Sequence, residues 1–456
     1  MQESQKSTLG KTLEKNRLVS IDVLANVVLS IYNVSNESSE KPSEKPSENP
    51  HVKNQETDSA IWKNISSMEP LLPEGNKTVL ADLTYKIIFE AGRLSGSGIH
   101  QKTIEGIGHV VRQMNSYYSN LIEGHKTSPR EVEKALKKNF DRDPVQKGLQ
   151  QLGVAHIQAE EQIIMSLQEN PKTNIWSPNF LKMIHGEFYS RLPVEQRIVK
   201  DTKGRECPLI PGQFRDYNVD IGQHVPPDHS CLASFMSRFE SFYGSSQIVA
   251  TRRLTAIAAS HHRLLWIHPF GDGNGRVARL FSHAALIQSG LDGYGLWTLA
   301  RGLARRRDDY YKCLAMADGV RENDYDGRGN LSARHLAVFC EFFLTTILDQ
   351  IIFMSSVLDY EGLKHRIENY IYRNNIFGKH DDHGKHLLLE ALHVGEYQRG
   401  EITRLTGYAE TNARALFQIA LTKGLLVSEG PRSQVRLGFP NEALEDYFPK
   451  LFMPSN

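Results

Sequence analysis

Apolar residues recur every three or four positions along most of this chain, a spacing that places them on one face of an α-helix. The pattern is clear in residues 79–88, 104–114 and 148–167, and it returns further along the chain. The chain is therefore predicted to be mainly α-helical. The other helices that we predict in the first 360 residues cover 179–190, 232–243, 248–266, 275–288, 310–316 and 336–358.

Two stretches depart from this pattern. Residues 33–56 contain a repeated Lys-Pro-Ser-Glu unit, whose proline and charge leave too little apolar surface to offset the entropy lost on ordering. We predict a mobile linker there, after a short N-terminal helix. In residues 201–228, glycines and prolines surround the short β-type segments 214–219 and 219–224. We predict that these two segments form an exposed β-hairpin.

The last part of the chain has its own order of elements. Helical spacing in residues 385–393, 400–406 and 411–426 is followed by 427–438, which has the pattern of a small hairpin. This order is typical of a winged helix-turn-helix domain. Such domains bind DNA or dock onto proteins, so DNA is one predicted partner and a protein surface is the alternative.

The composition of the chain says more about its cellular location than about its function. The 54 basic and 53 acidic residues nearly cancel, so overall charge gives no sign of a nucleic-acid or membrane partner. An apolar run at 18–34 is interrupted by Asp22 and Asn26, which predicts an amphipathic helix and no membrane span. Four well-separated cysteines without a Cys-x-x-Cys pair argue against a zinc cage or a disulfide framework, and favour a reducing, cytoplasmic location.

A glycine-rich segment carries the clearest chemical signal. Residues 266–276 read Trp-Ile-His-Pro-Phe-Gly-Asp-Gly-Asn-Gly-Arg, with three glycines within five positions. Each glycine costs about 1 kcal/mol inside a helix, so the segment is predicted to be a turn in which backbone amides converge. Because a helix follows directly, its N-terminal amides and dipole would provide an anion site.

The side chains of this segment suit the handling of a phosphoryl group. Arg276 and Arg279 lie three positions apart and project from one helix face, and the guanidinium fork matches phosphate oxygens. Asp272 supplies a carboxylate that could hold Mg²⁺ against a polyphosphate. His268, whose ordinary pKa lies near neutrality, suits a general base for an alcohol. Each residue alone fits an ordinary turn or a solvated helix face; their joint spacing favours a site.

At this point the sequence resembles the Fic family. Residues 268–279 match the family pattern His-Pro-Phe-x-Asp/Glu-Gly-Asn-Gly/Lys-Arg-x-x-Arg at every fixed position. The resemblance covers about 78–348 and implies an all-helical catalytic core with the motif in a loop between two helices. It also implies transfer of AMP from ATP to a Ser, Thr or Tyr hydroxyl of a target protein. Gly275 favours AMP transfer, because some relatives that phosphorylate carry lysine there.

The resemblance further assigns roles to individual residues. His268 would be the base, Asp272 the magnesium ligand, and Asn274 with nearby backbone amides the cradle of the α-phosphate. Arg276 and Arg279 would contact the rest of the triphosphate. The nucleotide-binding set that follows is Gly271, Gly273, Asn274, Gly275, Arg276 and Arg279.

Two other segments resemble family features. Ser119 to Gly124 matches an inhibitory pattern, Ser/Thr-x-x-x-Glu-Gly/Asn, in which Glu123 would pair with Arg279 and exclude the γ-phosphate. The predicted hairpin resembles the flap that holds a target segment by adding a strand to it. Tyr310 and Tyr311 are candidates to line an adenine pocket, and equally candidates for the core.

We accordingly divide the chain into an N-terminal helix and linker (1–58), a helical region with the inhibitory helix (59–200), a catalytic core (201–358), and a linker helix with the winged helix (359–456). Two other functions stay open from the sequence. One is removal of AMP from a modified protein, with Glu123 orienting a water. The other is transcriptional regulation through the winged helix, with the core sensing nucleotide. We also predict that the chain can pair with a second copy of itself as a homodimer.

Overall fold

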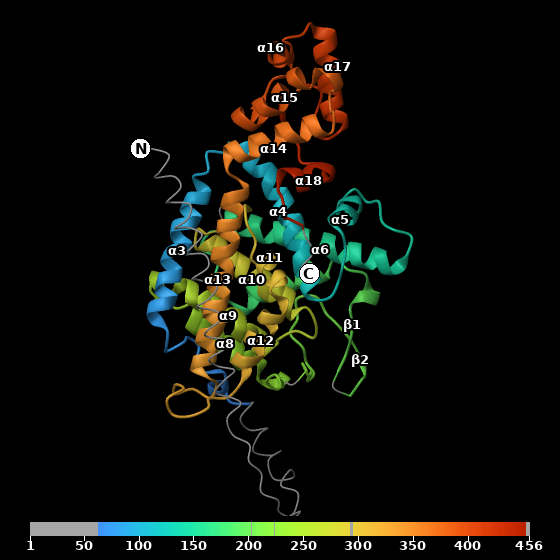
Figure 1. The fold of residues 1–456 in the computed structure, drawn as a ribbon. Helices are drawn as coiled ribbons and strands as arrows, with labels where there is room; N and C mark the ends of the chain where they lie inside the picture. The colour runs from blue at the N-terminus through green and yellow to red at the C-terminus, as the bar shows by residue number, and fades with distance from the viewer. Residues whose placement is uncertain (1–62, 202, 223, 292–294, 453–456) are drawn as a thin grey trace, which may run out of the picture. The chain divides into compact units, whose positions relative to one another are not determined.

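A computed structural model describes residues 63–201, 203–222, 224–291 and 295–452. The predicted N-terminal helix and linker therefore lie outside the described residues. The prediction of a mainly α-helical chain is confirmed (Figure 1). The helices up to residue 357 are α3 (Lys77–Ser95), α4 (Gln101–Ile122), α5 (Pro129–Leu136), α6 (Pro144–Glu169), α7 (Pro178–Tyr189), α8 (Leu232–Tyr243), α9 (Ala250–Ile267), α10 (Asn274–Gln288), α11 (Leu299–Arg305), α12 (Arg307–Asp318) and α13 (Ala333–Val357).

Local sequence explains where three consecutive helices begin. α5, α6 and α7 each start with a proline that follows Ser128, Asp143 or Ser177, and each of these polar side chains accepts a hydrogen bond from a backbone N–H of the first turn. Proline suits the first helical position because its missing N–H would have no partner there. α5, like α11, is too short to show a clear apolar repeat: α5 lies within a stretch that the sequence predicts as helical without bounds of its own, and α11 was not predicted.

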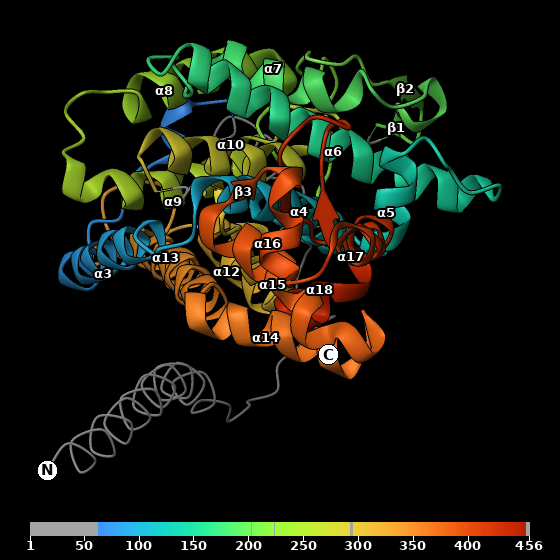
Figure 2. The ribbon, with the colours of Figure 1, turned by 90° about the horizontal axis from the view of Figure 1, so that it is seen from above.

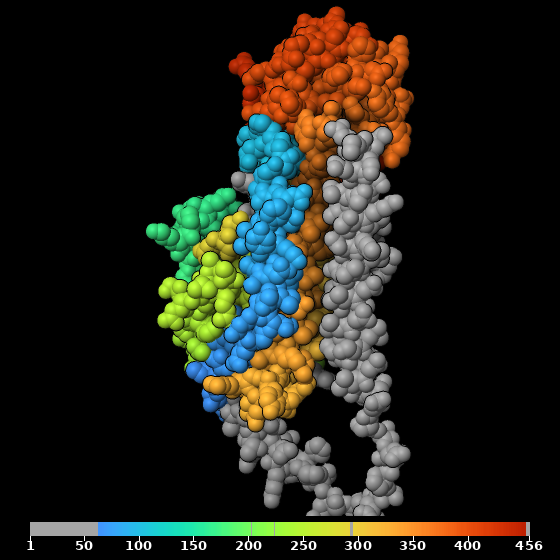
Figure 3. Space-filling view, turned by 60° about the vertical axis from the view of Figure 1, so that its left-hand side comes forward, coloured from blue at the N-terminus to red at the C-terminus, as the bar shows by residue number. Residues whose placement is uncertain are grey.

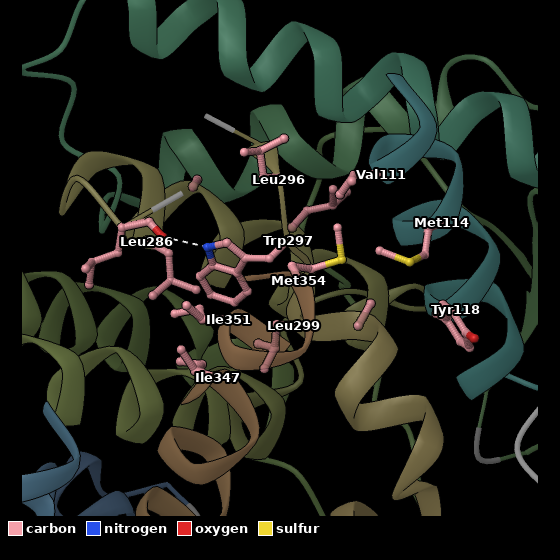
Figure 4. Close-up of a cluster of buried hydrophobic side chains, with 14 of the residues drawn as sticks. Val111, Met114, Tyr118, Leu286, Leu296, Trp297, Leu299, Ile347, Ile351 and Met354 are labelled. Carbon is pink, nitrogen blue, oxygen red and sulfur yellow. Dashed lines mark hydrogen bonds between the residues drawn. The ribbon is translucent and has the colours of Figure 1, made fainter. Parts of the chain in front are cut away.

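Helix α13 is the central apolar element of the core. Figure 4 shows Ile347, Ile351 and Met354 of α13 facing the Trp297 side chain, whose indole N–H donates to the Leu291 carbonyl (2.8 Å). In the described part of the chain α13 alone is long and apolar enough to cross a membrane, but 61% of its most apolar window is buried inside the protein. Its hydrophobicity is therefore used in packing.

Helices α3 and α4 pack on this core in different ways. α3, blue in Figure 3, runs along the surface beside α13 and leaves Tyr85, Ile88 and Phe89 exposed. α4 is mostly buried: Met114, Tyr118 and other side chains of one face join the cluster drawn in Figure 4. The burial of α4 fixes the position of its C-terminal end.

The predicted hairpin at 214–224 is wrong. The two-stranded sheet lies earlier, between β1 (Ile198–Lys200) and β2 (Glu206–Pro208), and the Asp201 carboxylate closes its turn by accepting the N–H groups of Lys203 and Arg205. Among the described residues of segment 214–224, the only β-pairing is an isolated bridge between Ile221 and His224. Its backbone bonds elsewhere, because the Arg215 N–H donates to the Pro269 carbonyl (2.9 Å).

The C-terminal elements, orange and red in Figure 2, follow the predicted order with two additions, a short strand and a last helix at 441–447. A short strand comes after the first predicted helix, and the resulting antiparallel sheet has the order β3-β5-β4. The elements are α14 (Tyr360–Arg373), α15 (Asp381–Val394), β3 (Glu396–Tyr397), α16 (Ile402–Thr406), α17 (Glu410–Thr422), β4 (Leu426–Val427), β5 (Val435–Leu437) and α18 (Asn441–Tyr447). The winged-helix assignment stays a prediction, as do the finer boundaries of the four parts.

The C-terminal elements contact α4 directly. The Thr103 hydroxyl donates to the Ala391 carbonyl (3.5 Å), and the Tyr118 hydroxyl donates to the Leu451 carbonyl (3.1 Å). The described residues, from 63 onward, form one compact unit. Helix α4 therefore joins the C-terminal elements to the region that contains the predicted loop.

Candidate active site

The glycine-rich segment forms a short loop between α9 and α10. His268 ends α9 in the left-handed region (φ 49°), and its N–H donates to the Leu264 carbonyl (3.0 Å). Pro269 cannot continue the helix because it has no N–H to donate. Gly273, also left-handed (φ 80°), starts α10, whose first internal bond runs from the Val277 N–H to the Gly273 carbonyl (2.9 Å). The amides before Val277 therefore have no acceptor within the helix and are available to an anion.

The Asn274 side chain closes this loop. Its Oδ1 accepts the Phe270 N–H (2.9 Å), and its Nδ2 donates to the Phe270 carbonyl (2.8 Å). Both polar atoms of the side chain are used, and the residue is buried. The side chain therefore fixes the backbone of the loop, and the predicted role of Asn274 with nearby amides in cradling phosphate stays a prediction.

Arg215 supports the same loop from the covering segment. Its Nε donates to the His268 carbonyl (2.9 Å), and its other nitrogens donate to the carbonyls of Tyr217 (2.9 Å) and Pro227 (2.6 Å). A Cβ on Gly271 would collide with the Tyr217 hydroxyl oxygen. The segment predicted as a hairpin therefore covers the loop through one buried arginine, and glycine at 271 permits the close approach.

The environment of His268 favours one neutral form of the ring. Its Nδ1 lies 3.2 Å from the Leu265 carbonyl oxygen, and because a carbonyl only accepts, this contact places the proton on Nδ1. Burial lowers the pKa of His268 to about 4. The ring is therefore uncharged at neutral pH, and its Nε2 is free to accept a proton.

Tyr189 of α7 joins two of the predicted site residues. Its hydroxyl donates to Asp272 Oδ2 (2.6 Å) and accepts from Arg276 Nη1 (3.1 Å). A Cβ on Gly273 would collide with the Tyr189 ring. Desolvation raises the pKa of Asp272, but the Arg276 guanidinium and the Tyr189 hydroxyl outweigh it and hold this pKa below its usual value. Asp272 is therefore held as an ionised carboxylate next to the loop.

The structure brings Ser119, Glu123 and Arg279 together. Arg279 Nη2 donates to Glu123 Oε1 (2.6 Å) and to the Ser119 carbonyl (3.0 Å), and Arg279 Nε donates to Ser119 Oγ (2.9 Å). Gly124 takes a positive φ (85°) after the helix end, and the His125 N–H returns to the Asn120 carbonyl (2.9 Å). This C-terminal cap directs Glu123 toward α10.

The Glu123 carboxylate lies against the first turn of α10. A Cβ on Gly275 would collide with Glu123 Oε1 and would approach Arg279 Nη1 to 3.1 Å. Burial opposes ionisation of Glu123, but Arg279 and Arg276 outweigh it and lower the pKa. A negative charge thus lies beside the free amides of α10.

Comparison with known proteins agrees with this geometry. Residues 177–286, which include the loop and the helices on both sides, match the family model described as Fic/DOC family. The chain contains a Fic/DOC domain.

Part of the chain is similar to proteins named as adenylyltransferases. Proteins from Drosophila grimshawi and Drosophila virilis, each named Protein adenylyltransferase Fic, are 36% and 39% identical to the chain over 142 residues. These alignments cover 30% of the chain and 28% of each relative. The chain thus aligns with less than a third of the length of these relatives. A crystal structure of a Fic family protein from Desulfovibrio desulfuricans aligns over 79% of this chain and 95% of that chain, with 16% identity and a TM-score of 0.45.

The two tyrosines predicted as candidates for an adenine pocket have different surroundings. Tyr310 is buried, and its hydroxyl lies 2.7 Å from His261 Nε2. Tyr311 is 39% exposed, and its hydroxyl donates to the Ile122 carbonyl (3.2 Å). Tyr310 is thus a core residue, while Tyr311 contacts the end of α4. The adenine-lining role of either tyrosine stays a prediction.

Sequence reasoning missed Tyr189 and Arg215, which organise the site of the Fic/DOC domain. Both lie far from the loop in sequence, 83 residues for the Tyr189–Asp272 contact and 53 for the Arg215–His268 contact. Neither belongs to a short motif. The sequence around Arg215 is rich in glycine and proline, but it also contains Lys203 and Arg205, so it did not single out Arg215.

Proposed function

We propose that the chain transfers AMP from ATP to a hydroxyl group of a protein. His268 Nε2 accepts the proton of a Ser, Thr or Tyr hydroxyl while its oxygen attacks the α-phosphorus. The bond from the α-phosphorus to the oxygen that bridges to the β-phosphate breaks, and pyrophosphate leaves. The free amides at the start of α10 and the Arg276 guanidinium stabilise the charge that develops on the phosphate oxygens. The observation that carries the proposal is the neutral His268 beside this anion site.

The residues present fit Mg²⁺ as a bound partner of ATP. Among the described residues, no three His, Cys, Asp or Glu side chains form a group that could hold a metal ion. Mg²⁺ needs no such cage, because it usually takes one or two carboxylates and completes its shell with phosphates and water. Asp272 is the carboxylate that would hold it, and the ion would offset charge on the pyrophosphate.

We propose that Glu123 holds this domain in a resting state. Its carboxylate pairs with Arg279 and lies where the triphosphate would bind. ATP would then have to separate the pair or bind in a poorly aligned pose. The relatives' printed name supports the transfer reaction, and the Glu123–Arg279 contact supports its inhibition.

The position of a radioactive label on ATP shows which phosphate group is transferred to the protein. Purified full-length chain carrying Glu123→Gly is incubated with Mg²⁺ and ATP labelled on the α- or the γ-phosphate. We expect protein to gain the α-label and no γ-label, since the pyrophosphate half leaves. Mass spectrometry should find one added AMP on a hydroxyl side chain. Transfer of the γ-label would instead identify a kinase and refute the proposal.

The pH profile of labelling tests the state of His268. Its pKa of about 4 means that the ring is neutral above that pH. The rate should therefore rise as pH increases through about 4 and stay flat through pH 6.5, the ordinary histidine value. Initial rates of α-label transfer by the Glu123→Gly chain give the profile. A rising limb centred near 6.5 would contradict the buried, neutral base.

We also propose a reducing, cytoplasmic setting. All four cysteines are free thiols, at positions 207, 231, 313 and 340. Burial raises the pKa of Cys340 to about 12 and that of Cys313 to about 11, so neither is reactive as a thiolate at neutral pH. Free cysteines in a large chain are typical of reducing compartments.

A further inference from the structure

A pocket lies beside the C-terminal end of α4, apart from the loop of the Fic/DOC domain. Its volume is about 730 Å³, and Tyr117, Leu121 and Gly124 form one wall. Lys126 to Ser128 and residues 304–309, at the junction of α11 and α12, complete it. The lining includes neither Glu123 nor any residue of 268–279. The pocket is therefore separate from the loop proposed to bind the phosphates of ATP.

The charge of this pocket is positive and largely unpaired. Four cations line it, and of these only Arg306 has a carboxylate partner in the described part of the chain, namely Asp309 (3.2 Å). Lys126, Arg305 and Arg307 form no ion pair with any described residue. Asp308 also lines the pocket, so the cations still outnumber the carboxylates by two to one. Unpaired cations around one hollow favour an anionic ligand.

A buried hydroxyl points to the same chemistry. Thr127 lines the pocket and is 7% exposed, yet its Oγ1 has no hydrogen-bond partner among the described atoms. A buried polar group without a partner costs about 1–3 kcal/mol. The neighbouring Ser128 hydroxyl already accepts the Glu131 N–H as the cap of α5. The Thr127 oxygen is itself closed to solvent, so its side chain would have to turn toward the pocket to meet a ligand oxygen.

We propose that this pocket binds the phosphate group of a phosphorylated small molecule. Guanidinium and ammonium groups suit a phosphate dianion better than a single carboxylate, because it offers three charged oxygens. Lys126, Arg305 and Arg307 supply the charge. The half-buried Tyr117 and Leu121 leave an apolar wall for the rest of the molecule.

The pocket is connected to Glu123 through one carbonyl. Arg307 Nε donates to the Ile122 carbonyl (2.8 Å), and the Tyr311 hydroxyl donates to the same oxygen (3.2 Å). Ile122 immediately precedes Glu123 and is the last residue of α4. A phosphate that engages Arg307 competes with this carbonyl, loosens the helix end and weakens the hold on Glu123. This step rests on the proposed function; the binding site does not.

Calorimetric titration of the full-length chain with inorganic phosphate tests the site. The double variant Lys126→Ala/Arg305→Ala should bind phosphate at least about tenfold more weakly than the unaltered chain. The matched variant Arg130→Ala/Lys147→Ala removes two exposed cations that do not line the pocket and should bind normally. Arg276→Ala, in the proposed ATP site, should also bind within about twofold. Unchanged affinity in the pocket variant, or loss of binding with Arg276→Ala alone, would overturn the proposal.

Two further arms identify the source of the phosphate and its effect. Sedimentation with vesicles containing phosphatidic acid, lost in the pocket variant, would indicate a lipid headgroup, and phosphate binding without vesicle binding would indicate a soluble molecule. Phosphate should also raise α-label transfer by the unaltered chain by at least about fivefold, and leave Glu123→Gly unchanged. If no variant labels protein, the proposed function fails while the titration still decides the pocket. If Glu123→Gly labels but phosphate does not stimulate the unaltered chain, the coupling is refuted.

Discussion

Replacing Glu123 with glycine should raise the rate of AMP transfer by about 10- to 100-fold. A carboxylate about 4 Å from a phosphate charge costs about 4 kcal/mol at an effective dielectric constant of 20. The Glu123 side chain is 27% exposed, so solvent screens part of this repulsion, and we expect less than the full thousandfold. The substitution also frees Arg279 for the nucleotide. Initial rates of α-label transfer, measured at saturating ATP, give the ratio directly.

Two substitutions separate charge from shape in this test. Glu123→Gln keeps the side-chain length and a hydrogen-bond acceptor for Arg279 but removes the charge, so its rate should fall between those of the unaltered chain and Glu123→Gly. Glu105→Gln changes an exposed carboxylate on the same helix and should have no effect. Equal rates for the unaltered chain and Glu123→Gly would dismiss inhibition by this residue.

The sequence was most informative where chemistry is local. The loop residues 268–279 are contiguous, so their order alone predicted a turn, an anion site and a following helix. The pairing of Glu123 with Arg279 could also be predicted, because Glu123 belongs to a short motif and Arg279 lies in the first turn of the helix that follows the loop. Even so, the sequence did not indicate that burial would lower the pKa of His268 to about 4, since desolvation depends on the whole fold.

Contacts between distant segments account for what the sequence could not predict. The alternating pattern at 214–224 resembles a hairpin, but one buried guanidinium directs that segment onto the loop, where Arg215 replaces strand pairing with bonds to single carbonyls. β1 and β2 are only three residues each, too short for a repeat to be visible. Tyr189 lies in an ordinary helical pattern, and its bridge between Asp272 and Arg276 depends on how α7 packs against α10.

Replacing His268 with alanine in the Glu123→Gly background should lower AMP transfer by at least about 100-fold, the lower range of a lost general base. The substitution should leave ATP binding nearly unchanged, because the free amides of α10 and Arg276 stay in place. The backbone at position 268 is left-handed (φ 49°), a conformation that alanine adopts less readily than histidine. Thermal unfolding of both chains should therefore be compared, to show that the variant is folded.

A second histidine variant tests whether the loss of AMP transfer is specific to the His268 imidazole. His229→Ala removes an exposed histidine that lies outside the loop, so it should transfer AMP at the parent rate. A folded His268→Ala chain that still binds ATP but does not label protein would place the defect in proton transfer, because the remaining contacts to the phosphates are intact. Undiminished labelling by that chain would refute His268 as the base, and the geometry of its Nδ1 contact with the Leu265 carbonyl would then serve only to end α9.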